Sequence, residues 1–145
     1  MYDMKVANGD LVLEAGGSAA TVSGHERIKQ DLACWLLEPL GTDPAYGRFG
    51  SKIHDFVGTP MWDTTVSDIR TEIARIVNNY AAYQNNEYQK AVASGGRANV
   101  LYTWSLSDLL TGSFSMHTRV QDDKIRITVA LQTQGGDTIT IDEVI

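Results

Sequence analysis

The fold is decided by residues 114–145, which read FSMHTRVQDDKIRITVALQTQGGDTITIDEVI. Apolar side chains occur there at every second position, which is the period of a β-strand with one buried face. Two polar turns, at residues 121–123 and 135–137, divide the stretch into three runs. We therefore expect antiparallel hairpins. The side chains expected on the buried face are Phe114, Met116, Thr118, Val120, Ile125, Ile127, Val129, Leu131, Ile139 and Ile141.

Two further strands are predicted outside this stretch. Val100, Tyr102 and Trp104 alternate in the same way, before a break at residues 106–112. Leu11 and Leu13 follow a turn at Asn8-Gly9-Asp10 and predict a short N-terminal strand, which we consider as an addition to the same sheet. Residues 98–145 are thus expected to form a mostly antiparallel sheet of three to four strands.

Residues 23–38 have the pattern of an amphipathic helix. Ser23 followed by Glu26 predicts a capping box, in which each side chain bonds a free backbone N–H. Pro39 ends the helix at about Glu38. Its apolar stripe is Ile28, Leu32, Trp35 and Leu36.

A loop rich in glycine and proline follows the first helix, over residues 39–50. Pro44, Tyr46 and Gly47 are its expected structural residues, and Tyr46 and Phe49 are expected to anchor it. Residues 51–57 predict a helix of barely two turns that ends before Gly58 and Pro60.

The longest predicted element is a helix over residues 65–93, which contain no glycine or proline. Its apolar residues are spaced by three and four, as in a heptad seam that needs a facing partner along its length. They are Val66, Ile69, Ile73, Ile76, Tyr80 and Tyr83. The two upstream helices cover only part of this seam, which therefore fits either an ordinary core helix or a contact surface. In the second case Tyr80, Tyr83 and Tyr88 are the predicted contacts for a partner protein. Beyond Tyr83 the helix is predicted to be polar, beginning with Gln84.

These elements predict an α+β fold, with two shorter helices and one long helix packed on the C-terminal sheet. The 145 residues fit one domain, 1–145, divided into an N-terminal approach (1–22), a helical part (23–93) and the sheet (98–145). With 18 acidic and 12 basic side chains the formal net charge is −6, which disfavours nucleic acid as a partner. No apolar run is long enough to cross a membrane, and synthesis in a reducing host cytoplasm fits the single cysteine, Cys34.

The sequence gives no positive indication of enzymatic chemistry. A glycosidase needs two carboxyl groups across a sugar, and the candidate pairs are Glu26 with Asp31 and Glu38 with Asp43. Each of these four residues is better explained by a cap, a polar helix face or a turn. His25, His54 and His117 have no nucleophile in a recognisable setting, and Cys34 beside the apolar stripe is typical of a small buried hydrophobe. We therefore expect no catalytic residue, cofactor or metal.

Several short motifs occur in a fixed order along the chain. They are Asn8-Gly9-Asp10-Leu11, Ile28, Gln30-Asp31-Leu32, Leu36, Gly41, Pro44, Tyr46-Gly47 and Ile53. This set resembles the gene-product-twenty-five-like family of baseplate wedge proteins from contractile phage tails and related injection machines. The match covers residues 8–57, and the order of helices and sheet extends it over the whole chain. One departure is the Glu-Pro-Arg tripeptide that the family often carries after the long helix to engage the baseplate core bundle, because no such tripeptide is present here.

The resemblance implies a structural protein of the virion tail, the sheath initiator. Its terminal sheet would resemble the interlocking domain of the sheath subunit and receive strands from the first sheath ring, with six copies arranged in a ring. The residues expected to bind the sheath protein are Thr138, Ile139, Thr140, Ile141, Asp142 and Glu143. Other wedge proteins and a hub or tube initiator would be further partners. Two alternatives remain open, a small peptidoglycan-degrading glycosidase and a protein-binding module unrelated to tails.

Overall fold

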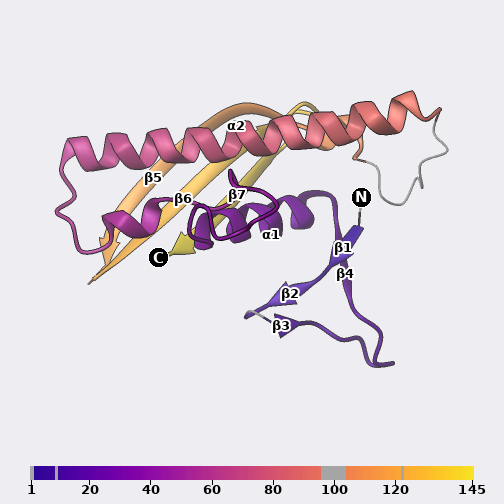
Figure 1. Cartoon of the computed structure of the whole chain (residues 1–145), viewed down its shortest axis with the longest axis horizontal. Coiled ribbons are helices and arrows are strands. Elements are labelled where there is room, and N and C mark those ends of the chain that lie inside the picture. Colours follow the sequence, from indigo (N-terminus) through magenta and orange to yellow (C-terminus); the bar gives the residue numbers. More distant parts are fainter. Residues whose placement is uncertain (1, 9, 96–103, 122) are drawn as a thin grey trace.

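A computed structural model of the chain describes residues 2–8, 10–95, 104–121 and 123–145 (Figure 1). Within them, helices α1 (Gly24–Leu37) and α2 (Asp63–Ala93) cover one face of an antiparallel sheet of β5 (Leu110–Gln121), β6 (Lys124–Thr133) and β7 (Thr138–Val144). The remaining elements are two 3-10 helices, η1 (Ile53–Phe56) and η3 (Leu106–Asp108), and the short strands β1 (Tyr2–Met4), β2 (Val6–Ala7), β3 (Asp10–Leu11) and β4 (Thr21–Ser23). The predicted α+β class is therefore confirmed in its main features, an antiparallel C-terminal sheet with a long helix against it.

The C-terminal sheet has the order β5-β6-β7 and the predicted register. Phe114 lies opposite Leu131, which lies opposite Ile139 on the next strand, so the apolar positions of all three strands share one face. Leu131 and Ile139 are at most 1% exposed. Of the predicted fourth strand, Val100 and Tyr102 lie outside the described residues. Trp104 is buried but precedes η3 and is in no strand.

The predicted short N-terminal strand is present as β3, but the N-terminal strands do not join this sheet, so the prediction that Leu11 and Leu13 extend it is wrong. β1 pairs with β4, and β2 pairs with β3 in a separate hairpin, where Leu11 lies opposite Val6. Gln30 of α1 fixes this region to the helix, because its side chain accepts a hydrogen bond from the Val6 N–H at 2.9 Å and donates one to the Met4 carbonyl at 2.9 Å. The ribbon therefore pairs with itself and packs on α1.

Helix α1 begins where the sequence predicts, but without the capping box. Ser23 is the N-cap residue and makes no side-chain cap hydrogen bond, while the Glu26 carboxylate is 2.8 Å from Lys29 Nζ one turn along. This lysine supplies the ion pair that replaces the predicted cap contact. The apolar stripe is confirmed, since Ile28, Leu32 and Leu36 are buried in the core.

Helix α2 begins at Asp63, two residues before the predicted start, with Trp62 as its N-cap residue. The Thr65 hydroxyl donates to the Pro60 carbonyl and does not cap the helix. The apolar seam of α2 is buried as far as Tyr80, which is 1% exposed. The sheet covers the part of the seam that α1 and η1 do not cover. The predicted polar surface is also wrong at Gln84, which is fully buried. Gln84 accepts a hydrogen bond from the Leu110 N–H at 3.0 Å and ties α2 to the start of β5.

Within the described residues, no helix is both long and apolar enough to cross a bilayer.

The loop at residues 39–50 closes on itself between α1 and η1. The Ser51 N–H donates to the Glu38 carbonyl at 2.7 Å, and the Leu40 N–H donates to the Ser51 carbonyl at 3.0 Å. The predicted helix at 51–57 is reduced to the single 3-10 turn of η1. Phe49 anchors the loop through an edge contact with Trp35 at 5.1 Å between ring centroids.

A charged pair on α2 holds this loop from the other side. Glu72 accepts hydrogen bonds from the Lys52 N–H at 2.9 Å and from Arg75, which also donates to the carbonyls of Arg48 and Gly50. The Glu72 carboxyl is buried, which by itself would raise its pKa, but the bonds from Arg75 and Lys52 outweigh burial and the pKa is lowered. The loop therefore has a fixed conformation above α2.

Candidate interaction surfaces

The first candidate surface is the free edge of β7. Ile125 and Ile145 exchange both backbone hydrogen bonds at 2.9 Å. In an antiparallel pair such doubly bonded residues recur at every second position, so Ile139, Ile141 and Glu143 direct their N–H and C=O groups to β6. The intervening residues direct theirs away from the sheet. These outward residues are Thr138, Thr140, Asp142 and Val144, which together define the β7 edge.

The β7 edge is open within the part of the chain that the structure describes. No hydrogen bond between described residues uses the N–H or C=O group of these four residues. Such an unpaired row of donors and acceptors is a template for another strand. Only half of the predicted sheath-binding residues belong to it, because Ile139 and Ile141 point their side chains into the core and bond their backbone to β6.

Strand β7 presents little uncompensated negative charge to solvent, although it contains Asp142 and Glu143. Asp142 forms an ion pair with Arg126 on β6 and accepts the Thr128 hydroxyl at 3.1 Å, and the bond from Arg126 lowers its pKa. Glu143 is half-buried, and burial raises the pKa of its carboxyl. Arg126 on the neighbouring strand therefore neutralises Asp142. The β7 edge offers backbone groups rather than charge.

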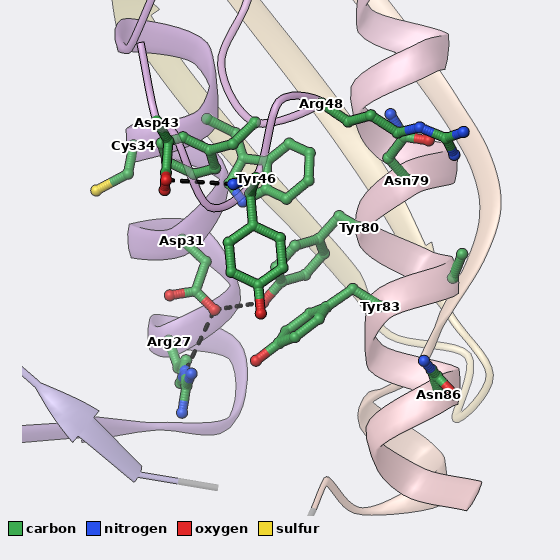
Figure 2. Close-up of a pocket in the computed structure, with 13 residues that line it drawn as sticks. Arg27, Asp31, Cys34, Asp43, Tyr46, Arg48, Asn79, Tyr80, Tyr83 and Asn86 are labelled. Carbon is green, nitrogen blue, oxygen red and sulfur yellow. Dashed lines mark hydrogen bonds and ion pairs between the residues drawn. The ribbon is translucent and has the colours of Figure 1, made fainter. Parts of the chain in front are cut away.

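The second candidate surface is a cavity of about 580 Å³ between α1, the loop 39–50 and α2, which we call the aromatic groove (Figure 2). Tyr80 lies at its base and Tyr83 on its α2 side, while Tyr46 reaches over it from the loop. Its lining residues are Arg27, Asp31, Cys34, Trp35, Asp43, Tyr46, Arg48, Phe49, Asn79, Tyr80, Ala82, Tyr83 and Asn86.

A buried polar pair lies at the base of the aromatic groove. The Tyr80 hydroxyl donates to Asp31 Oδ2 at 2.7 Å, and Arg27 Nε donates to the same oxygen at 3.2 Å. Burial raises the pKa of Asp31 more than these two donors lower it. The pKa of Tyr80 lies far above its ordinary range because the phenol is buried and adjoins this carboxylate, so Tyr80 remains a hydrogen-bond donor.

The three tyrosines predicted to bind a partner have different environments. Tyr80 is part of the core, with its ring centroid 6.3 Å from that of Trp104, so it offers a partner little accessible surface at the base of the groove. Tyr83 is half-buried and lines the groove. Tyr88 is also half-buried and packs against the core, but it is not among the groove residues. Tyr80 and Tyr83 therefore both line the groove, and Tyr83 is the more exposed of the two.

The loop residues contribute to the groove unequally. Pro44 and Gly47 are exposed and do not line it, whereas Tyr46 is 67% exposed and does. Tyr46 therefore does not anchor the loop as predicted. Asp43 accepts the N–H groups of Ala45 and Tyr46 at 2.7 and 3.2 Å, a turn that positions Tyr46. Sequence analysis missed Arg27 and Asp31 as groove residues, although their spacing of four on an amphipathic helix signals a paired polar face.

The carboxylates considered for catalysis each have a structural partner. Glu26 pairs with Lys29, Asp31 with Tyr80 and Arg27, and Glu38 accepts the Thr42 hydroxyl at 2.5 Å. Asp43 caps the loop turn as described.

His25, His54 and Cys34 were also considered for catalysis or metal binding, and the structure gives each a defined environment. His25 lies 3.4 Å from Asp108, and His54 Nε2 lies 2.7 Å from the Leu37 carbonyl. Cys34 is exposed at the groove rather than buried, and partial desolvation together with Asp31 raises the pKa of its thiol. Among the described residues, no cluster of His, Cys, Asp and Glu is placed to hold a metal ion.

Comparisons with protein families, curated proteins and solved structures found no relative of this chain.

Proposed function

We propose that this chain is a structural component of a contractile-tail baseplate that nucleates sheath assembly, located in the virion tail. The observation that carries the proposal is the β7 edge, an unpaired strand edge on a sheet held rigid by a packed core. The sequence resemblance to baseplate wedge proteins names the partner, a tail-sheath subunit. The geometry by itself also suits an unrelated protein-binding module, and the experiment below separates the two.

The mechanism is strand addition. An extended arm from a sheath subunit lies beside β7 and exchanges hydrogen bonds with the outward groups of Thr138, Thr140, Asp142 and Val144. Its alternate side chains then lie next to those of β7, on the exposed face and on the helix-covered face. Affinity comes from the backbone and selectivity from these side chains. Six copies in a ring would present six such edges in one orientation.

The aromatic groove is the proposed contact for a second baseplate protein. Tyr46 and Tyr83 supply apolar ring surface and hydroxyl groups at its rim, a combination that is frequent in protein interfaces. Because the groove lies in the helical layer and the β7 edge belongs to the sheet, the two partners would occupy different surfaces. This arrangement fits a protein that links the wedge to the sheath.

The test replaces one outward N–H. Proline at Thr140 removes a donor that faces the arm without removing a bond to β6, because edge positions whose N–H faces outward tolerate proline. The matched control is Val120→Pro, which removes an outward N–H from β5 at the other edge of the sheet. Deletion of residues 138–145 is unsuitable, because it also removes Ile139 and Ile141 from the core.

Each variant is mixed with the candidate sheath subunit, and sheath assembly is scored by negative-stain microscopy. We expect short or absent sheaths with Thr140→Pro and normal sheaths with Val120→Pro, while both variants keep the wild-type circular dichroism spectrum. Normal sheaths from a folded Thr140→Pro variant would overturn strand addition at β7. Failure of the wild-type chain to bind any sheath subunit would favour the unrelated binding module.

A further inference from the structure

The exposed face of the C-terminal sheet, opposite the helices, contains a small charged hollow of about 250 Å³. The residues that line it are His117, Arg119, Arg126, Thr128 and Asp142. They form two rows across the strands: His117, Thr128 and Asp142 are paired in one row, and Arg119 lies opposite Arg126 in the next. Residues paired across antiparallel strands share a face, so all five side chains project to the same side.

The two arginines of the hollow are not equally compensated. Like charges directly opposite each other on a sheet are destabilising. Arg126 is neutralised by Asp142, with Nε 3.0 Å from Oδ1, and the Thr128 hydroxyl holds the same carboxylate oxygen. The guanidinium of Arg119 makes neither a hydrogen bond nor an ion pair with any residue that the structure describes. Its guanidinium is exposed, and the hollow carries an excess of positive charge on a chain whose net charge is −6.

We propose that Arg119 and His117 bind a carboxylate side chain of an acidic protein segment. The guanidinium presents parallel N–H donors that fit a carboxylate with two hydrogen bonds, and the imidazole adds a donor beside it. The ion pair between Arg126 and Asp142 is an internal example of this recognition, one strand away. A carboxylate bound by Arg119 would also relieve its repulsion with Arg126.

The charge of the chain favours a short acidic segment over nucleic acid. A polyanion extends beyond the hollow and meets the net negative charge of the whole molecule, whereas a single Asp or Glu side chain needs only the local positive charge. The site lies on β5 and β6, while strand addition uses the backbone edge of β7. The inference is therefore independent of the proposed sheath contact, and either one can fail alone.

The test is an NMR titration of the full-length, isotope-labelled chain with a short peptide of alternating Glu and Ser, at low ionic strength. We expect chemical-shift changes confined to the amides around His117, Arg119 and Thr128 and to Arg119 Nε. Arg119→Gln should weaken binding about tenfold, the order of magnitude of a charge-assisted pair. The matched control, Lys5→Gln, removes one positive charge from an exposed side chain between β1 and β2 and should leave the affinity unchanged.

A third variant gives a change in the opposite direction. Asp142→Asn frees the Arg126 guanidinium, so binding of the acidic peptide should become tighter. Equal affinity for a peptide of alternating Gln and Ser, or an equal loss with Lys5→Gln, would overturn the proposal. Tighter binding of a single-stranded oligonucleotide, lost in Arg119→Gln, would overturn the choice of a protein segment. So would self-association of the chain that the same substitution abolishes.

Discussion

The carbonyl oxygen of Pro39 lies 2.6 Å from the position that a Cβ atom on Gly50 would occupy. Gly50 also has a φ of +92°, which side chains rarely adopt. The loop 39–50 closes at this point, where Ser51 bonds back to Glu38. Any side chain at position 50 must therefore push apart the two backbone segments that meet here, at Glu38–Leu40 and at Gly50–Ser51.

We expect Gly50→Ala to lower the free energy of unfolding by about 3 kcal/mol or more, because it combines a backbone clash with an unfavourable φ. The control is Gly47→Ala. An added Cβ at Gly47 meets no atom within 4 Å, so its effect should stay within about 0.5 kcal/mol. Urea denaturation followed by circular dichroism measures both. Equal stabilities of the two variants would show that the closure is not rigid.

The buried amide of Gln84 gives a second prediction. Gln84→Leu replaces the amide by an apolar side chain of similar size and leaves the Leu110 N–H without its acceptor, which should cost about 1–3 kcal/mol. Gln89→Leu changes an exposed residue of the same helix and should be close to neutral. Hydrogen exchange of the Leu110 amide is the direct measurement. Slow exchange in Gln84→Leu would mean that another group accepts this bond.

Much of the fold is contained in local patterns of the sequence. Alternation at Ile125–Leu131 and Ile139–Ile141 predicts the hairpins correctly, because a one-residue shift in register would expose every apolar side chain. The start of α1 at Gly24 is also predicted, although its capping box is not. Local competition explains the difference, since Glu26 has Lys29 available one turn away.

Local sequence patterns do not specify which element packs on which apolar face. A heptad-like spacing from Val66 to Tyr83 fits a helix, a sheet or a partner protein equally well, and in the structure the chain's own sheet covers it as far as Tyr80. Tertiary context likewise buries Gln84, which has a polar side chain at a position that the pattern assigns to solvent. The aromatic groove was unpredictable for the same reason, because it needs the loop placement that Glu72 and Arg75 fix across the fold.

The ion pair between the buried Glu72 and the partly exposed Arg75 predicts a dependence of stability on pH. The pKa of Glu72 is lowered in the folded state from an ordinary value of 4.5, so its ionised form stabilises the fold above that pH. This contribution is lost as the pH falls through the lowered pKa, because the carboxylate must then be protonated. Glu72→Gln should therefore be less stable than the wild type by about 1–2 kcal/mol at neutral pH, with a smaller difference in acid.

The measurement for Glu72 is the free energy of unfolding of both proteins between neutral pH and the acid limit of the fold. Glu87→Gln serves as the control, since Glu87 pairs with Lys90 on the surface and such exposed pairs contribute little. A difference between wild type and Glu72→Gln that stays constant down to the acid limit would contradict the ionic role of Glu72.

Tyr83 and Ile73 belong to the same predicted seam but should respond differently to a buried charge. Ile73 is 1% exposed, and Ile73→Asp should cost more than about 4 kcal/mol or abolish folding, because it buries an unpaired carboxylate. Tyr83 is half-buried at the wall of the aromatic groove, so Tyr83→Asp should cost only about 1–2 kcal/mol.

The same Tyr83→Asp variant tests the groove as a contact surface. If a baseplate protein occupies the groove, its binding to the folded variant should weaken by at least about tenfold, because a charge replaces an aromatic side chain at the rim of an apolar contact. Isothermal titration with the neighbouring wedge protein measures this. Asn85→Asp is the matched control, since it adds a carboxylate to an exposed position of α2 that does not line the groove. Unfolding by Tyr83→Asp would make this residue part of the core, and equal binding by both variants would place the partner elsewhere.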